Sequence, residues 1–421
     1  MHISLSEVFS PGVMPDLTYI NRAPQGESMT YEAKLKKALL KNGNLISITG
    51  GTKTGKTVLC NRVFGKDSFI KISGSQIDSR EKFWQLIAEK LELPEEISIS
   101  YATQSQDNHK TALSAKAALL NILSSGLNTE NGSSQTASEN TTRKILRSNT
   151  LIMDLLIKSH IVLVIDDFHY IDKETQLYLA RTLKAEIFNG LRAIILSLPH
   201  RADDAIRLNP DLIGRMSFIE LAPWSKDELK EIARKGFSLL KMDITEDTLD
   251  YIATESALSP QLMQENCFNI AFQVQETNSK TITTQDAQTA FKETVAEYKH
   301  YSDTAQSILA GPAKGRSRRK VYHTKDGKTC DIYALILLSI SADPPVLQIS
   351  INELRQRMEK IIVPEEKLPT TLILSKMMKH VEEIIHQSIP DNDTLDWKNS
   401  TLYILDPFLL FYLRWDKGYL R

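Results

Sequence analysis

A glycine-rich loop with a lysine and a threonine is the part of this sequence whose chemistry is most easily stated. The apolar run Leu45–Thr49 leads into Gly50-x-x-x-x-Gly55-Lys56-Thr57, and glycines let backbone N–H groups come close to phosphate oxygens. A helix beginning near Lys56 would add the positive end of its dipole. The pattern predicts a phosphate-binding loop in which Lys56 reaches the β- and γ-phosphates and Thr57 offers a hydroxyl to Mg²⁺. The expected nucleotide contacts are Gly50, Gly51, Thr52, Lys53, Thr54, Gly55, Lys56, Thr57 and Val58.

Two adjacent carboxylates follow a second apolar run. Ile161–Ile165 is the kind of aliphatic run that forms a parallel strand buried on both faces. Asp166 and Asp167 stand at its carboxyl end, where such sheets bind their ligands. Adjacent carboxylates also occur in plain surface loops. Beside a phosphate-binding loop, Asp166 is expected to hold Mg²⁺, directly or through water, and Asp167 to polarise the attacking water.

The segments around these motifs alternate between strand and helix patterns, which predicts an α/β fold with a parallel sheet. The expected helices are Thr30–Leu40, Ser79–Leu91 and Asp172–Asn189, and the further strands are Ser68–Gly74, Leu191–Ser197 and Ser217–Leu221. Residues 124–147 are polar and rich in Gly, Ser, Asn and Thr. They predict a flexible surface insertion within an α/β domain over 1–222.

From Pro223 onward the pattern becomes helical. A capping box at Ser225–Glu228 opens the first of four predicted helices, at 225–240, 245–254, 261–275 and 284–298, which together form a helical domain over 223–300. Residues 301–330 are predicted to be a basic linker followed by a hairpin around Asp326-Gly327. The linker's basic side chains either contact nucleic acid phosphates or form a solvated hinge; they are Lys314, Arg316, Arg318 and Arg319.

The remainder, 331–421, resembles a winged helix, with helices at 331–341, 350–362 and 370–386, a short strand at 346–348 and a last strand at 397–404. The third helix is the recognition position of helix-turn-helix proteins. Lys376, Lys379 and His380 on it could meet DNA, whereas Glu382 and Glu383 beside them favour a protein-binding winged helix. The aromatic tail from Tyr403 to Trp415 is expected to pack back on this domain.

With these motifs the chain, from about Tyr19 to its end, resembles P-loop ATPases of the AAA+ and STAND groups. The tail, Asp406-Pro-Phe-x-x-Phe-x-x-Arg-Trp415, is similar to the ending of archaeal-type ATPases whose helical lid is followed by a winged helix. The resemblance implies ATP and Mg²⁺ as ligands and a lid that moves with the nucleotide.

The resemblance also implies roles for residues outside the two motifs. Tyr19–Arg22 is similar to the box that lies against adenine, with Asn21 where Gly is usual; Arg22 is otherwise a surface arginine after a short strand. Ser197, at a strand end, matches the polar sensor near the γ-phosphate, with Arg201 as the alternative.

Arg215 resembles the arginine that AAA+ proteins insert into a neighbour's site, which implies an oligomer; the alternative is a surface arginine in a loop. Pro260 stands in a turn like the family's Gly-x-Pro, where a second sensor arginine would follow. Gln261 occupies that arginine's place, which favours a switch over direct sensing of the γ-phosphate.

Composition sets the remaining limits. The 421 residues carry a formal net charge of -1, so contact with nucleic acid would need a local basic patch. The three cysteines, Cys60, Cys267 and Cys330, lie far apart and fit a reducing compartment. With neither a secretory signal pattern nor an apolar run of membrane-spanning length, the expected location is the cytoplasm.

The sequence thus predicts an ATPase switch that recruits or remodels a partner protein or DNA. By analogy with bacterial ATPases of this layout, the setting is anti-phage defence or mobile-element control. The alternative is a nucleotide-gated binding or scaffold protein with little turnover, which Asp167, in place of the more usual Glu, and Gln261 both allow.

Overall fold

The computed structural model describes residues 3–65, 68–93, 96–100, 142–146, 148–198, 214–312, 319–388 and 394–418. The chain divides into two compact units. The sheet unit comprises Arg22–Gly50 and Lys56–Ala222, and the helical unit comprises Met1–Asn21, Gly51–Gly55 and Pro223–Arg421. Among the residues in these ranges, no helix combines the length and apolar character needed to cross a membrane.

The sheet unit is built on a five-stranded sheet in the order β2-β5-β6-β1-β7. Every neighbouring pair is parallel, which confirms the predicted fold class. Its strands are β1 (Leu45–Thr49), β2 (Phe69–Ser73), β5 (Val162–Asp166), β6 (Ala193–Ser197) and β7 (Met216–Glu220). The three central strands are buried along their whole length, as expected for parallel strands covered on both faces.

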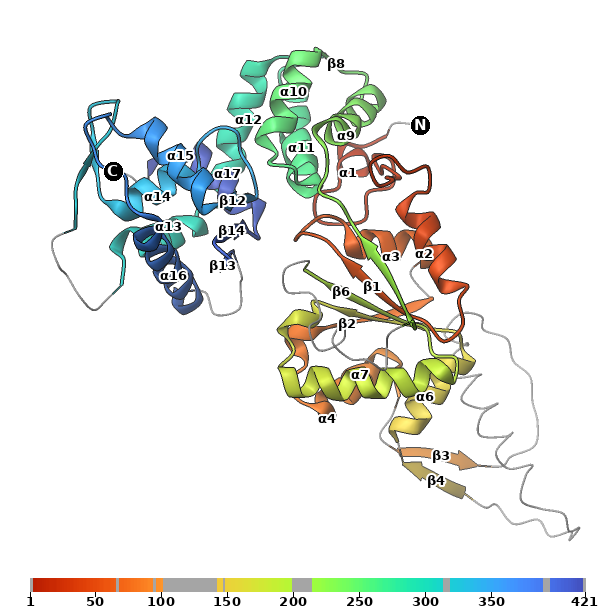
Figure 1. Cartoon of the computed structure of the whole chain (residues 1–421). Helices are drawn as coiled ribbons and strands as arrows, with labels where there is room; N and C mark the ends of the chain where they lie inside the picture. The colour runs from red at the N-terminus through yellow and green to blue at the C-terminus, as the bar shows by residue number, and fades with distance from the viewer. Residues whose placement is uncertain are drawn as a thin grey trace, which may run out of the picture. The chain divides into compact units, whose positions relative to one another are not determined.

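Helices cover both faces of this sheet (Figure 1). One face carries α2 (Tyr31–Leu39) and α3 (Lys56–Phe64), and the other carries α4 (Arg80–Lys90), α6 (Asn149–Lys158) and α7 (Lys173–Phe188). The two cores share β5 by alternation, since Val162 and Val164 pack in one and Leu163 and Ile165 in the other. Successive side chains of β5 thus point to opposite faces of the sheet. Because helices cover both faces, ligands can bind at the carboxyl ends of the strands.

The predicted insertion over 124–147 is wrong at its end. Thr142–Leu146 forms a strand, β4, that pairs antiparallel with β3 (Glu96–Ser100) as a separate two-stranded sheet (Figure 1). In the register, Ile145 is paired with Ile97. The polar composition of the whole segment hid the short apolar pair Ile145-Leu146; residues 124–141 and 147 lie outside the described residues.

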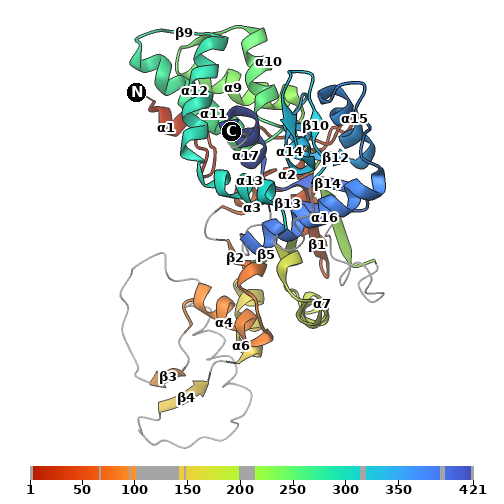
Figure 2. The same cartoon turned by 90° about the vertical axis from the view of Figure 1, so that its left-hand side faces the viewer.

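The helical unit contains the four predicted helices (Figure 2), which are α9 (Lys226–Leu239), α10 (Glu246–Glu255), α11 (Pro260–Glu276) and α12 (Thr284–Glu297). The capping box is confirmed, because Ser225 N donates to Glu228 Oε2 at 2.7 Å and Glu228 N donates to Ser225 Oγ at 3.2 Å. The strands β8 (Asp243–Ile244) and β9 (Thr281–Ile282) add a small parallel pair, and α1 (Leu5–Val8) packs with α11.

A further helix, α13 (His300–Ala310), occupies the start of the segment predicted to be a linker. Tyr301, Ala305 and Ile308 are buried along one face, which is helical spacing. The predicted linker is therefore wrong over 300–310, where the apolar spacing is helical and the basic run has not yet begun. The hairpin that follows it is confirmed as β10 (Tyr322–His323) paired with β11 (Thr329–Cys330).

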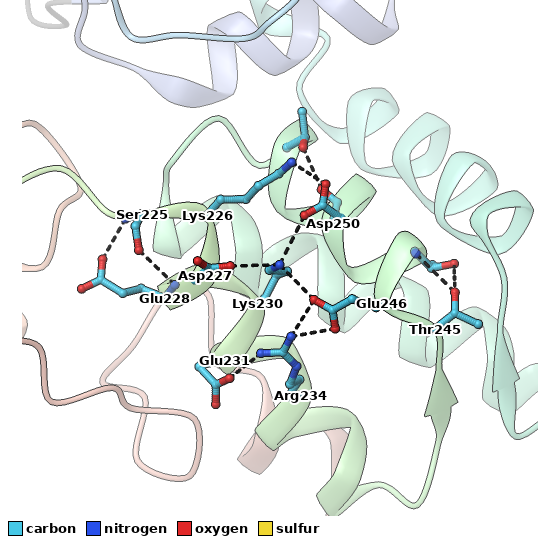
Figure 3. A network of polar contacts seen from close by, with 12 residues as sticks. Ser225, Lys226, Asp227, Glu228, Lys230, Glu231, Arg234, Thr245, Glu246 and Asp250 are labelled. Atoms are coloured by element: carbon cyan, nitrogen blue, oxygen red, sulfur yellow. Dashed lines mark hydrogen bonds and ion pairs between the residues drawn. The ribbon is translucent and has the colours of Figure 1, made fainter.

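Lys226, Lys230 and Arg234 of α9 pair with acids of α10 (Figure 3). Lys230 Nζ lies 2.9 Å from Glu246 Oε1 and 3.3 Å from Asp250 Oδ1. Arg234 reaches both oxygens of Glu246 at 2.7 Å. These ion pairs compensate the charges of Lys230 and Arg234, so neither side chain presents an unpaired cation to a phosphate.

The C-terminal part has the helices and the three-stranded antiparallel sheet of a winged helix: α14 (Ile332–Ile340), β12 (Gln348–Ser350), α15 (Ile351–Ile361), α16 (Thr371–Ser388), β13 (Leu395–Lys398) and β14 (Thr401–Ile404). The single strand predicted at 397–404 is in fact the hairpin β13–β14. Asn399 and Ser400 turn it with φ of 52° and 58°, the left-handed pair that two-residue hairpins need. No glycine marked that turn in the sequence.

The aromatic tail forms α17 (Pro407–Trp415), and it packs on α12 and α13 rather than, as was expected, on the winged-helix segment alone. The Phe411 ring meets Phe291 of α12 edge to face at 5.5 Å. Arg414 Nη2 pairs with Glu255 Oε1 at 2.6 Å, and both side chains are over nine-tenths buried. This paired burial holds α17 against α10 and α12.

Replacing Phe411 with alanine tests this packing. The ring is fully buried, so Phe411→Ala is expected to destabilise the protein by about 3–5 kcal/mol through lost burial and a residual cavity. The measurement is the midpoint of urea unfolding. Phe272→Ala on α11 is the matched control, since that ring is 52% exposed, and it should change stability by no more than about 0.5 kcal/mol. Equal effects of the two changes contradict the packing described.

Candidate functional site

The glycine-rich loop joins β1 to α3 in the way the sequence predicts. Gly55 has φ of 98° and Lys53 φ of 58°, so the turn uses left-handed backbone at two positions. Gly50 N donates to Ser197 O at 3.3 Å, which ties the start of the loop to the end of β6. Lys56 Nζ donates to Gly50 O at 3.0 Å and closes the loop from its other end.

Lys56 is a buried cation at the first turn of α3. Its exposed fraction is 8%. Burial lowers the pKa of its ammonium group, while the nearby Asp166 and Asp167 act in the opposite direction. A desolvated ammonium group beside a helix N-terminus attracts an anion strongly, because little water competes for its charge.

Asp166, the last residue of β5, is held by several donors. Thr57 Oγ1 donates to its Oδ2 at 2.9 Å, and the Asp167 backbone N–H donates to its Oδ1 at 3.0 Å. Lys71 Nζ of β2 lies 3.4 Å from Oδ2. The hydroxyl of Thr57 and the carboxylate of Asp166 are therefore adjacent oxygen groups that could hold a metal ion.

This oxygen pair fits Mg²⁺. A Mg²⁺ ion commonly takes one or two protein oxygens and completes its octahedron with waters and substrate phosphates. In the part of the chain that the structure describes, His, Cys, Asp and Glu do not gather in threes or more that could hold a metal alone. The site therefore suits a metal that arrives with a phosphate ligand rather than a protein cage.

Asp167 follows with φ of 52°, so its backbone turns sharply away from the strand. Burial, followed by the charge of Asp166, raises the pKa of its carboxyl, and Lys56 and Lys71 offset part of that effect. A carboxylate with a raised pKa is a stronger base than an exposed one. Asp167 thus lies beside Asp166 with a carboxyl that is more basic than usual.

Sequence reasoning missed two residues that shape this edge. Lys71 was the one charged residue within the apolar strand Phe69–Ser73, and that anomaly could have indicated it. Gly74 follows the strand, and a Cβ there would lie 2.9 Å from the Asp167 carbonyl carbon and 3.2 Å from the Asp166 carbonyl oxygen. Only a glycine lets β2 end this close to the acidic pair.

Ser197 and Arg22 differ in their relation to this site. Ser197 is fully buried at the carboxyl end of β6, directly beside Thr49 in the sheet register, so the structure brings it to the loop. Arg22 Nη2 donates to Ala222 O at 2.9 Å, and its guanidinium lies 5.7 Å from the Tyr31 ring centroid. Arg22 thus connects α2 to the chain after β7, and its predicted contact with adenine stays a prediction.

Arg215 lies at the amino ends of the strands, opposite to the carboxyl ends that carry the phosphate-binding loop. It precedes β7, and Met216 is in register with Leu45 at the amino end of β1, whereas the loop follows the carboxyl end. A five-residue strand spans about 16 Å. Its guanidinium rests 5.8 Å from the Phe188 ring centroid, so Arg215 is not brought to the site of its own chain.

The predicted roles of Pro260 and of the basic linker residues stay predictions. Pro260 is the first residue of α11 in the helical unit. Arg319 Nη1 pairs with Asp331 Oδ2 at 2.6 Å and donates to Leu309 O at 2.8 Å. These contacts give the Arg319 guanidinium a structural role. Lys314, Arg316 and Arg318 lie outside the described residues. Lys376 and Lys379 are exposed on α16, whereas the His380 ring lies 3.4 Å from the Tyr333 hydroxyl.

Comparison with known proteins agrees with this geometry. Residues 39–204 match the family model described as "AAA domain", which covers the loop, the acidic pair and Ser197. A 102-residue stretch is 32% identical to RuvB-like helicase 1 of Emericella nidulans, over 22% of this chain and 21% of that protein. The chain therefore matches about a fifth of the length of that curated relative.

Solved structures similar to the whole chain have low identity. Cdc6p of Pyrobaculum aerophilum is 16% identical over 99% of each chain, with a TM-score of 0.44. The ORC2 protein of Aeropyrum pernix is 15% identical over 97% of this chain and 96% of that one, with a TM-score of 0.45. The RuvB Holliday junction branch migration motor of Thermotoga maritima is 13% identical over 91% and 95%, with a TM-score of 0.39. These TM-scores are too low to indicate the chemistry of the site.

The raised pKa of Asp167 predicts a pH-dependent gain in stability on its removal. The native state holds this proton more tightly than the unfolded state, so wild-type stability falls as the pH rises through the window above the usual Asp pKa. Asp167→Asn removes the buried charge and should raise Tm at about pH 7.5, with the difference vanishing near pH 4. Thermal unfolding across this range is the measurement.

The control for this experiment is the exposed Asp78 of the same unit. Asp78→Asn should leave Tm unchanged across the range. A lower Tm for Asp167→Asn at neutral pH, or a shift that does not vary with pH, would show that the Asp167 carboxylate is not strained by its surroundings.

Proposed function

We propose that this chain, in which residues 39–204 form an AAA-type P-loop domain, is an ATPase switch of the AAA+/STAND kind that binds ATP with Mg²⁺ and hydrolyses it. The output is recruitment or remodelling of a partner protein or DNA. The observation that carries the proposal is the convergence of Lys56, Thr57, Asp166 and Asp167 at one edge of a parallel sheet.

Each side chain has a distinct task in this proposal. The backbone N–H groups of the loop and the Lys56 ammonium group bind the phosphates and neutralise charge that develops on the γ-phosphate. Thr57 and Asp166 would hold Mg²⁺ through their oxygens, and the ion would supply positive charge that stabilises the phosphates during transfer. Asp167 accepts a hydrogen bond from the attacking water and orients it. Ser197, beside the loop, supplies a polar contact to the γ-phosphate side.

A nucleotide-gated scaffold with little turnover is the second candidate. The contact between Lys71 Nζ and Asp166 Oδ2 at 3.4 Å favours it, because a protein cation then competes with Mg²⁺ for the same carboxylate. The Lys71 side chain is 45% accessible, so solvent screens this competition. The contact therefore opposes metal binding only weakly.

The partner is a protein or DNA met through the winged helix. The exposed Lys376 and Lys379 on α16 support DNA, although the exposed Glu383 on the same helix opposes it. Leu372, with 81% of its surface exposed at the start of α16, supports a protein partner instead.

ATP binding and phosphate release, measured separately, test the proposed function. Lys56→Ala should weaken ATP binding by about 100-fold or more, because it removes the buried cation. Asp167→Asn should keep ATP binding and lower phosphate release by about 100-fold. Lys36→Ala is the control, since Lys36 is 60% exposed on α2 of the same unit. Tight ATP binding without phosphate release, with and without DNA, would favour the scaffold; wild-type protein that does not bind ATP would contradict both candidates.

Arg215 gives a second test, of oligomeric action. Because Arg215 lies at the amino edge of its own sheet, we propose that it completes the site of a neighbouring copy. Phosphate release per chain should then rise with protein concentration, and Arg215→Ala should abolish that rise while ATP affinity is kept. Arg192→Ala is the matched control, as this arginine precedes the strand β6 at the same edge. Turnover that is independent of concentration and of Arg215 would assign it a surface role.

A further inference from the structure

The phosphate-binding loop and the start of α17 meet at one ion pair within the helical unit. Lys53 Nζ lies 2.7 Å from Asp406 Oδ1 and 4.3 Å from the centroid of the Phe408 ring. Both Gly51–Gly55 and the segment from Pro223 onward belong to this unit. The Asp-Pro-Phe motif of the tail therefore touches the loop through its first and third residues.

Asp406 is a buried carboxylate whose other contacts fix it in place. It is 6% exposed, and its Oδ1 accepts a hydrogen bond from Phe408 N at 3.1 Å as the N-cap of α17. Its Oδ2 accepts from the Tyr301 hydroxyl, and burial together with Asp406 raises the pKa of that hydroxyl, so it remains a donor. Lys53 adds a positive charge to these neutral donors.

The loop is held at a second point by the same unit. Trp224 Nε1 donates to Thr54 O at 3.0 Å, next to Lys53 in its left-handed conformation. The middle of the loop is therefore restrained on both sides of the Lys53–Thr54 peptide. Any movement of this peptide toward a phosphate must strain or break these contacts.

The charges indicate which state the ion pair favours. A triphosphate bound by the loop's N–H groups would lie within a Debye length, about 8–10 Å, of both partners. It would attract Lys53 and repel Asp406. A seated Asp406 neutralises a cation of an anion-binding loop and places a negative charge beside it, so it opposes nucleotide binding.

We propose that Asp406 is a regulatory carboxylate: through Lys53 it lowers the affinity of the loop for ATP while α17 is seated, and bound ATP in turn loosens α17. The second effect follows from the first, because coupling between two equilibria is reciprocal. The inference rests on the proposed function in that it requires ATP binding at this loop. It adds a route from the loop to the C-terminal tail.

A double-mutant cycle on ATP affinity tests the coupling. Asp406→Asn keeps a helix-capping side chain and removes the charge, so ATP binding should tighten by about fivefold or more. In the Lys53→Met background the same change should have no more than about a twofold effect, since the pair is already broken. Equilibrium binding of a fluorescent ATP analogue to the full chain is the measurement.

Asp331→Asn is the matched control. Asp331 also caps a helix, accepting from Tyr333 N at 3.0 Å and Ala334 N at 2.9 Å. It also pairs with a cation, Arg319, at 2.6 Å, but it does not touch the loop. This control should leave ATP affinity unchanged. A tightening equal to that of Asp406→Asn would reduce the effect to general charge and overturn the proposal.

Hydrogen exchange on wild-type protein keeps the proposal testable if Asp406→Asn does not fold. ATP should speed exchange of the α17 amides, and this acceleration should be absent in Lys53→Met. ATP that binds without altering α17 exchange would overturn the regulatory role and leave the proposed function intact. Wild-type protein that does not bind ATP would contradict the proposed function itself.

Discussion

The candidate site depends on the 2.9 Å hydrogen bond from the Thr57 hydroxyl to Asp166. Thr57 belongs to the helix after β1, and Asp166 ends β5, with β6 between these strands in the sheet. The bond therefore joins two segments more than a hundred residues apart in sequence. It also brings together the two protein oxygens best suited to Mg²⁺. Lys56 precedes Thr57 and Asp167 follows Asp166, so the same bond helps to set the positions of these two residues.

The surrounding fold serves this pair by packing rather than by polar contacts. The aliphatic residues of β5 and β6 are buried on both faces, which fixes the strand ends from which Asp166 and Ser197 project. Gly74 completes the edge because a larger residue would collide with the backbone of Asp166 and Asp167. A charged site of this kind is costly to desolvate, and the raised pKa of Asp167 and lowered pKa of Lys56 show that cost.

The sequence predicted the parallel sheet and the two motifs well, because buried aliphatic runs and a glycine-rich loop are strong local signals. It missed the approach of Lys71 to Asp166, because strand order decides which side chains become neighbours and a single sequence does not state that order. The turn at Asn399–Ser400 was missed because left-handed backbone there lacks a glycine. The contact between Lys53 and Asp406 could not be predicted, because it joins residues 353 positions apart. In the sequence, Lys53 belongs to the phosphate-binding loop and Asp406 to the tail motif, and neither pattern indicates the other.

Metal binding measured by electron paramagnetic resonance tests the central claim most directly, with Mn²⁺ in place of Mg²⁺ and a non-hydrolysable ATP analogue. The account predicts one bound Mn²⁺ per chain when the analogue is present. Binding should be lost in Thr57→Val, which removes the hydroxyl ligand at nearly constant volume. Undiminished Mn²⁺ binding in Thr57→Val, or analogue binding that is indifferent to the metal in wild-type protein, would contradict the claim that Thr57 and Asp166 form a metal-dependent phosphate site.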